Sequence, residues 1–487
     1  MADSSKEDQK EAKTVEISFP FILIRTKKGL SLIDRLARLR FIKKLGWLLL
    51  YMLPIAAFVG FYLILRAATA LISSAPLRSF AGQFNPLINL GIPGINPYLP
   101  IVYGWIALII AMIVHEGMHG ILARSTGLSV KSSGIILLLI LPIGAFVDID
   151  EKELKKAKAK DSGRVLAAGP GANIITAGIA LLCLILIVSS MIPIASGVGV
   201  RGVIQSSQAE EEGIMFGDII TSIDGSNLTF QSDLDKALEI HAGENVTLTI
   251  TRDDIKLNYT LKMPDGPVIA GVLQDFPAQK AGVLPGDIIT ELNETKITSL
   301  DKLNETLATF KPGDNVILKV ERGEEIKDFS IMLASDPQNS SRAFLGVTLR
   351  TPSESLGILS VGIVETLERY WSLSSTTPLI HLLLPTLAPN NIPFSDVMYR
   401  FYTSSIGDAF YPLANLFFWI WFLNINLAIF NALPIYPLDG GQAFKVFLQA
   451  IGKNRLSDKS VTRITNGVTL AMVSLVIFMI AVPYLTI

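Results

Sequence analysis

The chain has 487 residues, of which 50% are hydrophobic, and its mean hydropathy is +0.47. Soluble globular chains rarely reach such a hydropathy, so the composition favours an integral membrane protein that lies in a lipid bilayer. The net charge of −1 gives no indication of a nucleic-acid partner, and the lone Cys183 excludes an internal disulfide and a cysteine-based zinc cluster.

The N-terminal region is polar and basic. Met1–Lys13 is mostly charged and has no apolar core at the distance typical of a signal peptide, so we expect no cleaved signal and a short disordered tail. We predict that residues 1–44 form a cytoplasmic segment that precedes the membrane part.

Five apolar stretches are long enough to cross the hydrocarbon core as helices, which takes about 20 residues. They are Leu45–Leu65, Tyr98–Leu122, Gly171–Pro193, Ala409–Leu438 and Gly467–Leu485. A shorter apolar stretch, Gly134–Phe146, indicates a re-entrant or interfacial segment. Ser355–Leu384 is interrupted by charged residues and a proline, so we expect it to be amphipathic and to lie on the membrane surface.

Basic residues in short loops predict the orientation. Arg25–Lys44, Glu151–Arg164 and Gln442–Arg463 each carry an excess of lysine and arginine, which places them in the cytoplasm. The long polar insert, residues 197–350, then lies outside. Asn-x-Ser/Thr sequons occur only in this insert, which supports the assignment; they begin at Asn227, Asn245, Asn258, Asn293, Asn304 and Asn339.

The insert contains an internal repeat. Gly213-Ile-Met-Phe-Gly-Asp-Ile-Ile-Thr221 matches Gly282-Val-Leu-Pro-Gly-Asp-Ile-Ile-Thr290, so the period is that of one small domain. Each copy shows a short helix, a Gly-Asp turn, alternating strands, an amphipathic helix and a further strand pair. The pattern resembles PDZ domains, which bind an extended peptide or a C-terminus at a sheet edge. The alternative is a pair of purely structural β-domains.

These features together predict an α-helical polytopic membrane protein with an inserted pair of α+β PDZ-like domains. We expect about five to six transmembrane helices plus re-entrant segments. The first half of the membrane domain spans residues 45–196 and the second half residues 352–487. The PDZ-like domains occupy residues 197–266 and 267–351.

A His-Glu-x-x-His motif stands near the end of the second predicted span, at His115, Glu116 and His119. Histidines four positions apart lie on one face of a helix, so both imidazoles can bind one metal ion. Glu116 then lies beside the site, where it can act as a general base toward a water whose pKa zinc lowers to about 7. The alternative is a pair of polar residues at a helix interface. However, ionisable residues in a membrane helix are costly and usually have a function.

A catalytic zinc needs a third protein ligand. His241 lies in the insert and His381 lies outside the membrane or at its surface, so both are expected to be structural. Asp439 is the better candidate, because it ends the stretch Ala409–Leu438, which arrives at the same side as the histidines.

Two further motifs carry polar or helix-breaking residues into the membrane. Asn431–Gly440 contains Pro434 and Pro437, so it cannot be a continuous helix and is expected to line a cavity. Gly169-Pro-Gly-Ala-Asn173 opens the third predicted span. Asn173 can donate a hydrogen bond to a developing oxyanion, or it can cap the helix.

The three motifs in this order and membrane setting resemble the site-2 protease family of intramembrane zinc metalloproteases. The resemblance implies that zinc is held by His115, His119 and Asp439, that Glu116 is the general base and that Asn173 assists the transition state. It also implies that Gly144–Asp150 is a strand that can pair with an unwound substrate.

The leading hypothesis is therefore cleavage of single-span membrane proteins in a prokaryotic plasma membrane, with PDZ-like domains outside that gate or bind substrate. The active site is expected toward the cytoplasmic side. A non-catalytic receptor or scaffold is the alternative, against which Glu116 and the complete ligand set argue. A metal transporter would be expected to carry more ligands within the membrane.

Overall fold

The computed structural model describes residues 15–82, 85–89, 91–96, 99–139, 141–337, 339–371, 399–452 and 455–485. Internal contacts divide the chain into two units. The first, here called the membrane unit, comprises Met1–Ile187, Leu379–Pro389 and Pro412–Ile487, and the second, the inserted unit, comprises Val188–Pro378 and Asn390–Tyr411. Met1–Lys13 and His381 lie outside the described residues.

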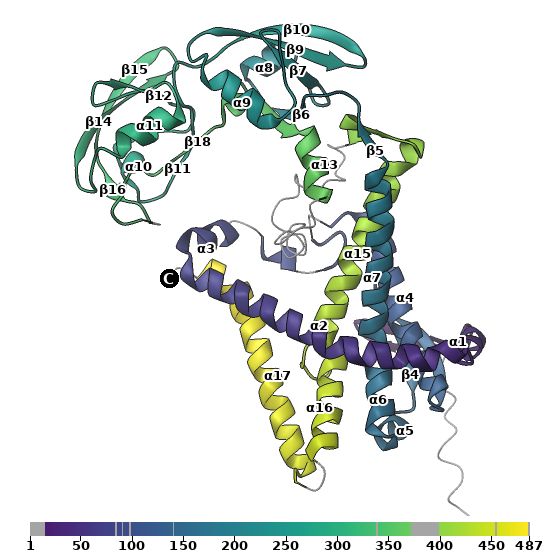
Figure 1. Ribbon diagram of the computed structural model, residues 1–487. Coiled ribbons are helices and arrows are strands. Elements are labelled where there is room, and N and C mark those ends of the chain that lie inside the picture. Colours follow the sequence, from purple (N-terminus) through teal and green to yellow (C-terminus); the bar gives the residue numbers. More distant parts are fainter. Residues whose placement is uncertain are drawn as a thin grey trace, which may run out of the picture. The chain divides into compact units, whose positions relative to one another are not determined.

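Among the described residues, five helices are long and apolar enough to cross a membrane, in agreement with the five predicted spans. They are α2 (Arg40–Ser73), α4 (Ile101–Ser125), α7 (Ala168–Ser189), α15 (Phe410–Ala432) and α17 (Asp458–Ala481). Within the membrane unit α4, α7 and α15 run side by side (Figure 1). The fourth span ends at Ala432 instead of Leu438, because Pro434 and Pro437 follow and proline cannot continue a helix.

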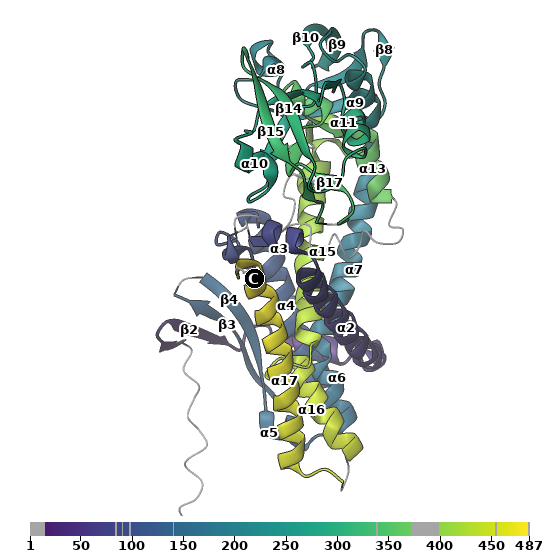
Figure 2. The same cartoon turned by 90° about the vertical axis from the view of Figure 1, so that its left-hand side faces the viewer.

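A four-stranded antiparallel sheet accompanies these helices, in the order β1-β2-β3-β4. Figure 2 shows it beside α4. Its strands are β1 (Val15–Ser18), β2 (Phe21–Thr26), β3 (Val130–Leu138) and β4 (Leu141–Ile149). The segment Gly134–Phe146, predicted to be re-entrant or interfacial, lies in the hairpin of β3 and β4. Pairing of β3 with β2 and β4 gives its backbone groups hydrogen-bond partners.

Short helices connect the spans. α1 (Leu30–Ala37) precedes α2, and α5 and α6 lie between β4 and α7. The Asp150 side chain caps α5 by accepting hydrogen bonds from two backbone N–H groups of its first turn. The remaining elements are α3 (Ala75–Gly82), η1 (Pro86–Asn89), α5 (Glu151–Lys156), α6 (Ala159–Leu166), α16 (Asp439–Gly452) and η5 (Val482–Tyr484).

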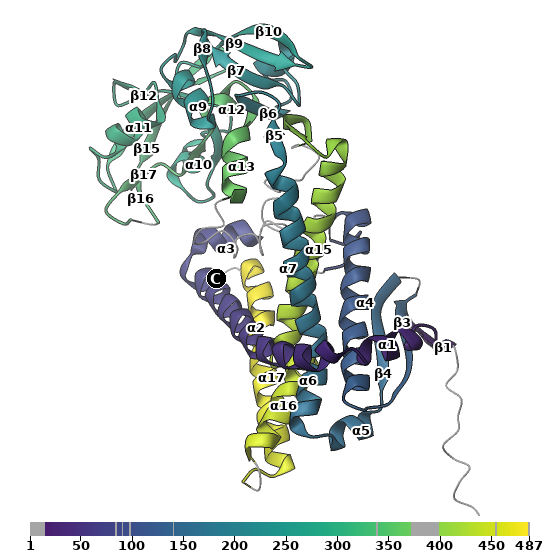
Figure 3. The ribbon, with the colours of Figure 1, turned by 45° about the vertical axis from the view of Figure 1, so that its right-hand side comes forward.

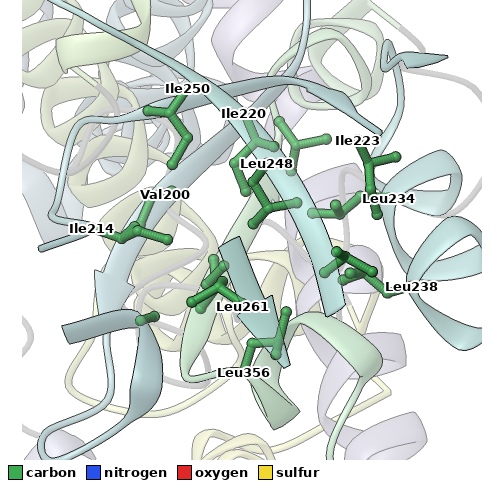
Figure 4. Packing of buried hydrophobic residues seen from close by; sticks show 14 of the residues in the cluster. Val200, Ile214, Ile220, Ile223, Leu234, Leu238, Leu248, Ile250, Leu261 and Leu356 are labelled. Carbon is green, nitrogen blue, oxygen red and sulfur yellow. The ribbon is translucent and has the colours of Figure 1, made fainter. Parts of the chain in front are cut away.

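The first copy of the repeat in the inserted unit is built on a sheet of order β10-β9-β7-β6-β19, with β8 paired to β7. Its strands cover a core of aliphatic side chains that includes Ile220, Leu234 and Leu248, each fully buried (Figure 4). The elements are β6 (Val198–Val203), α8 (Gln208–Glu211), β7 (Ile219–Ile223), β8 (Ser226–Asn227), α9 (Gln231–Glu239), β9 (Asn245–Arg252), β10 (Ile255–Lys262), α12 (Pro352–Ser355) and β19 (Ile358–Gly362).

The second copy repeats the order of the first seven elements of the first copy and has its own buried core. Its main sheet runs β13-β12-β14-β15, and two short pairs, β11-β18 and β16-β17, complete it. The elements are β11 (Ile269–Val272), α10 (Pro277–Ala281), β12 (Ile288–Leu292), β13 (Thr295–Lys296), α11 (Leu300–Leu307), β14 (Asn315–Arg322), β15 (Glu325–Met332), β16 (Ala334–Ser335), β17 (Ala343–Phe344) and β18 (Val347–Leu349).

The second copy is nested within the first. β19 follows the second copy in sequence and pairs antiparallel with β6, at the start of the first copy. The sequence predicts an amphipathic, surface-lying segment over Ser355–Leu384. Within it, Ile358–Gly362 is instead a strand, because its alternating residues are buried against the first copy's core, and the part beyond Trp371 lies outside the described residues. The inserted unit also contains α13 (Ile363–Trp371), β5 (Met191–Pro193) paired to β20 (Tyr402–Ser404), η3 (Tyr399–Phe401) and η4 (Gly407–Ala409).

A buried aspartate–arginine pair explains the repeated Gly-Asp turn. Asp218 is fully buried and accepts hydrogen bonds from Arg252 Nε (2.6 Å) and Nη2 (2.7 Å), and one from the backbone N–H of Met215. Asp287 makes the same bonds to Arg322 in the second copy. Burial alone would raise the pKa of Asp287, but the Arg322 guanidinium holds that pKa below its ordinary value.

We predict that Arg252→Leu lowers the unfolding free energy of the first copy by about 3 kcal/mol, because the buried Asp218 carboxylate loses its counter-charge. Hydrogen exchange of the full chain should show faster exchange in β7 and β9 and little change in β12 and β14. Arg322→Leu is the matched variant and should give the reverse pattern. Equal loss of protection in both copies from either change would contradict independent cores.

Candidate functional site

Helix α4 places three polar side chains near its C-terminal end. His115 and His119 are one helical turn apart, both are buried, and their ring centroids lie 4.9 Å apart. Glu116 follows His115 on the same helix. The helix is otherwise apolar over most of its length, so this polar cluster stands in a membrane-spanning element.

Asp439 completes the cluster from a distant part of the sequence. Its Oδ2 lies 3.0 Å from His115 Nε2 and 3.2 Å from His119 Nε2. The three candidate ligand atoms of His115, His119 and Asp439 all lie within 4.8 Å of one another. Two imidazole nitrogens and one carboxylate oxygen form a donor set that divalent zinc accepts, with a coordination position left for water or substrate.

The turn between α15 and α16 sets the position of Asp439. A Cβ on Gly440 would lie 2.1 Å from the carbonyl oxygen of Ala432, and one on Gly441 would lie 2.4 Å from the backbone of Ile435. Only glycine therefore allows α16 to begin so close to the end of α15. The N–H of Tyr436 donates to Thr469 Oγ1 at 2.9 Å, which ties the same turn to α17.

A hydrogen bond at Nδ1 fixes the ring orientation of His119. Its Nδ1 lies 2.7 Å from the carbonyl oxygen of Val165 in α6. A carbonyl oxygen only accepts, so Nδ1 carries a proton, and Nε2 is the ring nitrogen that faces Asp439 and could bind a metal ion. This is the tautomer that a metal ligand needs. Nothing in the sequence marks Val165 for this role, since its backbone makes the contact.

Glu116 contacts the sheet. Its Oε2 accepts a hydrogen bond of 3.1 Å from the backbone N–H of Val147 in β4. β4 is an edge strand of the four-stranded sheet, and it contains most of the segment Gly144–Asp150 that the sequence predicts to be a strand. The carboxylate is thus held beside the histidines by the strand that borders the site.

Gly169, at the second position of α7, leaves space at the centre of the site. A Cβ at this position would lie 2.4 Å from Nε2 of both His115 and His119. Gly169 begins the motif Gly169–Asn173, of which only Asn173 is predicted from the sequence to have a role. Because glycine has no side chain, it leaves room for an ion between Nε2 of His115 and Nε2 of His119.

Asn173 is one helical turn beyond Gly169 on α7 and is fully buried. Neither its Oδ1 nor its Nδ2 has a hydrogen-bond partner within the described part of the chain. Buried polar atoms nearly always have a partner, so an unpaired amide here calls for an explanation. No contact between Asn173 and the histidine–aspartate cluster is recorded among the described residues.

A pocket of about 940 Å³ adjoins the cluster and is lined by Glu116, His119 and Asp439. Its walls come from β4, from the turn at Tyr436 and from polar side chains of α5 and α16, among them Lys155 and Gln449. This volume lies in the range of ligand-binding pockets. The cluster therefore borders a pocket large enough to hold a small ligand.

His241 belongs to the inserted unit, as the sequence predicts. Its Nδ1 lies 2.9 Å from Glu244 Oε2, and its Nε2 lies 3.8 Å from Asp224 Oδ2. It thus makes local contacts within the first copy. The structure brings together His115, Glu116, His119 and Asp439.

Comparison with known proteins agrees with this arrangement. The sequence model of peptidase family M50 matches residues 103–476. An uncharacterised protein of Methanocaldococcus jannaschii is 33% identical over 247 residues, which cover 50% of this chain and 62% of that protein. The membrane metalloprotease ARASP, chloroplastic, of Arabidopsis thaliana is 28% identical over 44% of this chain and 48% of that protein.

A third relative is the regulator of sigma-E protease RseP of Escherichia coli. It is 24% identical over 422 residues, which cover 73% of this chain and 91% of that protein. The chain therefore matches about half to three fifths of the length of the first two relatives and nine tenths of the third.

We predict that Gly169→Ala weakens metal binding by roughly tenfold or more, because its methyl group would occupy space beside both Nε2 atoms. Metal content per chain, measured by mass spectrometry of purified protein dialysed against limiting metal, checks this. Gly178→Ala is the control, since a Cβ at this position on the same helix meets nothing within 4 Å. Equal metal retention in both variants would contradict the proposed place of the ion.

Proposed function

Since this chain belongs to peptidase family M50, the site-2 protease family that its motifs resemble, we propose that it is an intramembrane zinc metalloprotease. It would hydrolyse peptide bonds within or near the transmembrane segments of single-span membrane proteins, in regulated intramembrane proteolysis. The observation that carries the proposal is the meeting of Asp439 with two histidines from a membrane-spanning helix, beside Glu116.

In this proposal His115, His119 and Asp439 hold one Zn²⁺. When bound, the ion would lower the pKa of a water molecule and polarise the scissile carbonyl group. Glu116 acts as the general base that takes a proton from water and returns it to the leaving amine. Its hydrogen bond from the Val147 N–H holds the carboxylate in place through both steps.

Asn173 is proposed to stabilise the oxyanion that forms on the scissile carbonyl. Its buried amide has no partner in the described residues, so an Nδ2–H group is free to donate when charge develops on a nearby oxygen. An amide that gains its hydrogen bond only in the transition state lowers the barrier more than it strengthens substrate binding. The alternative role, a helix cap, would require a contact with backbone at the start of α7.

The edge of β4 is proposed to bind the substrate. A transmembrane helix hides its amides in intrahelical hydrogen bonds, so the bond to be cleaved must become extended first. An extended segment can pair with an edge strand through backbone hydrogen bonds. β4 presents this edge next to Glu116, which accepts a bond from the same strand.

The inserted unit is proposed to lie outside the cytoplasm and to contain two PDZ-like domains that bind a peptide or C-terminus of the substrate. Support comes from the basic residues of the loops on the other side and from the sequons within the insert. The fold of each copy, a small sheet with one longer helix, fits peptide binding at a sheet edge. A prokaryotic plasma membrane is the proposed location.

A non-catalytic receptor or scaffold remains the second candidate, because PDZ-like domains alone could recruit partners. Such a protein has no need of a general base beside a complete ligand set. The presence of Glu116 and of the cluster His115, His119 and Asp439 therefore favours the protease.

We predict that Glu116→Gln abolishes proteolysis, with a loss of about 100-fold or more, because glutamine cannot accept the proton from water. The assay co-expresses the chain with tagged single-span reporters whose outer domain has been truncated, and follows the cleaved fragment by immunoblot. Zinc content should be unchanged. Cleavage of a reporter by the variant at the parental rate would rule out Glu116 as the base.

We predict about one zinc ion per chain in the purified parent and a sharp loss in Asp439→Ala, because two histidines alone leave the ion short of a ligand. Elemental analysis of both proteins checks this. Asp458→Ala, at the start of α17, removes a carboxylate outside the cluster and serves as the control. An unchanged zinc content in Asp439→Ala would contradict the proposed metal site and favour the scaffold.

A further inference from the structure

The membrane unit has a second cavity, of about 450 Å³, where α1 meets α2. Its walls come from the end of α1, the turn into α2, the first turn of α2 and the end of α4. The charged residues that line it are Asp34, Arg38, Arg40, Lys43 and Arg124. None of its lining residues lines the pocket beside the histidine–aspartate cluster, so the two sites are distinct.

The cavity is strongly positive. Four of its lining residues are cationic and one is anionic. Arg38, Arg40 and Lys43 are exposed, and none has an ion-pair partner in the part of the chain that the structure describes. Three unpaired cations within six positions of one another repel each other unless an anion lies between them.

One wall of the cavity is rigid. Arg124, at the end of α4, lies 3.0 Å from Asp34 of α1, and its Nη2 donates to the carbonyl oxygen of Val130. Apolar contacts reinforce this join, because Ile42 of α2 and Leu122 of α4 are buried in one cluster with residues of α1. Figure 3 shows α1 crossing the end of α4. These contacts hold α1 against the end of α4 beside the cavity.

Large apolar side chains are exposed beside the cavity. Leu39, Phe41 and Leu48 are 42%, 57% and 53% exposed, and they precede or belong to α2, which is long and apolar enough to span a membrane. With α2 across a bilayer, exposed apolar side chains on it contact acyl chains. Arg40 and Lys43, within one turn of these side chains, would then lie at the depth of the headgroups.

We propose that this cavity binds the phosphate-bearing headgroup of an anionic phospholipid whose acyl chains lie along α2. Guanidinium groups bind phosphate through paired N–H donors, and lysine adds a point charge. Arg38 and Arg40 supply such donors from the turn, and Lys43 supplies its charge from the next turn of α2. A soluble phosphate compound shares the headgroup chemistry but would make no use of the apolar rim.

The test is a binding titration of the full-length protein in detergent by native mass spectrometry. The probes are phosphatidylglycerol and phosphatidylcholine with the same acyl chains. The parent should bind the first phosphatidylglycerol at least tenfold more tightly. The variant Arg38→Gln/Arg40→Gln/Lys43→Gln should weaken that binding by roughly 100-fold, at about fivefold per basic residue, and leave phosphatidylcholine unchanged.

A matched control removes the same charge nearby. Lys27→Gln/Lys28→Gln/Arg35→Gln changes three exposed basic residues that do not line the cavity and should have little effect. An equal loss in this control would overturn the proposal, because general surface charge would then explain the binding. Lys43→Gln alone, with an expected loss of about fivefold, keeps the test valid if the triple variant does not insert.

Two further experiments distinguish a phospholipid from a soluble phosphate compound and from an acidic protein. Millimolar inorganic phosphate should leave phosphatidylglycerol bound, since it lacks acyl chains, and complete displacement would overturn the lipid assignment in favour of a soluble phosphate compound. A short polyglutamate peptide should bind the parent and the triple variant equally weakly. Tight peptide binding that the triple variant loses, without preference between the two lipids, would overturn the proposal in favour of an acidic protein partner.

Discussion

The carboxylate of Asp439 lies against two imidazoles in the interior of the membrane unit, and much of that unit is arranged to make this contact possible. A partly buried carboxylate is stabilised by counter-charge or ligands, and α16 begins where His115 and His119 present Nε2. Glycines at 440 and 441 allow the necessary turn, and α7 approaches with a glycine at 169. The carbonyl of Val165 sets the tautomer of one ring. Four separate elements thus meet at one small volume.

The sequence predicted which polar residues lie together better than it predicted the sheet. The His-Glu-x-x-His spacing pointed to His115, Glu116 and His119 because helical periodicity acts over a few residues, and the order of the predicted spans pointed to Asp439. Gly169 and Val165 were missed since one acts by lacking a side chain and the other by its backbone. The β1–β4 sheet was missed because β2 pairs with β3 across more than a hundred positions.

The two units use buried charge differently. In each copy of the repeat an arginine neutralises one buried aspartate through two hydrogen bonds, and the same geometry recurs at Asp218 and Asp287. These pairs are complete within the protein and serve the fold. In the membrane unit the corresponding carboxylate meets two imidazoles whose nitrogens also suit a metal, and a buried asparagine nearby is left without a partner. The two aspartate–arginine pairs thus have their hydrogen bonds within the protein, whereas the amide of Asn173 has none among the described residues.

The nesting of the second copy within the first has a consequence for the order in which the chain folds. β6 is made early, but its partner β19 is made only after the whole second copy has followed. During synthesis the second copy, whose contacts are more local, can close first, while the first copy waits with an unpaired strand edge. The domain that begins first in the sequence is therefore completed last. Until β19 has been synthesised, the free edge of β6 must not pair with another strand.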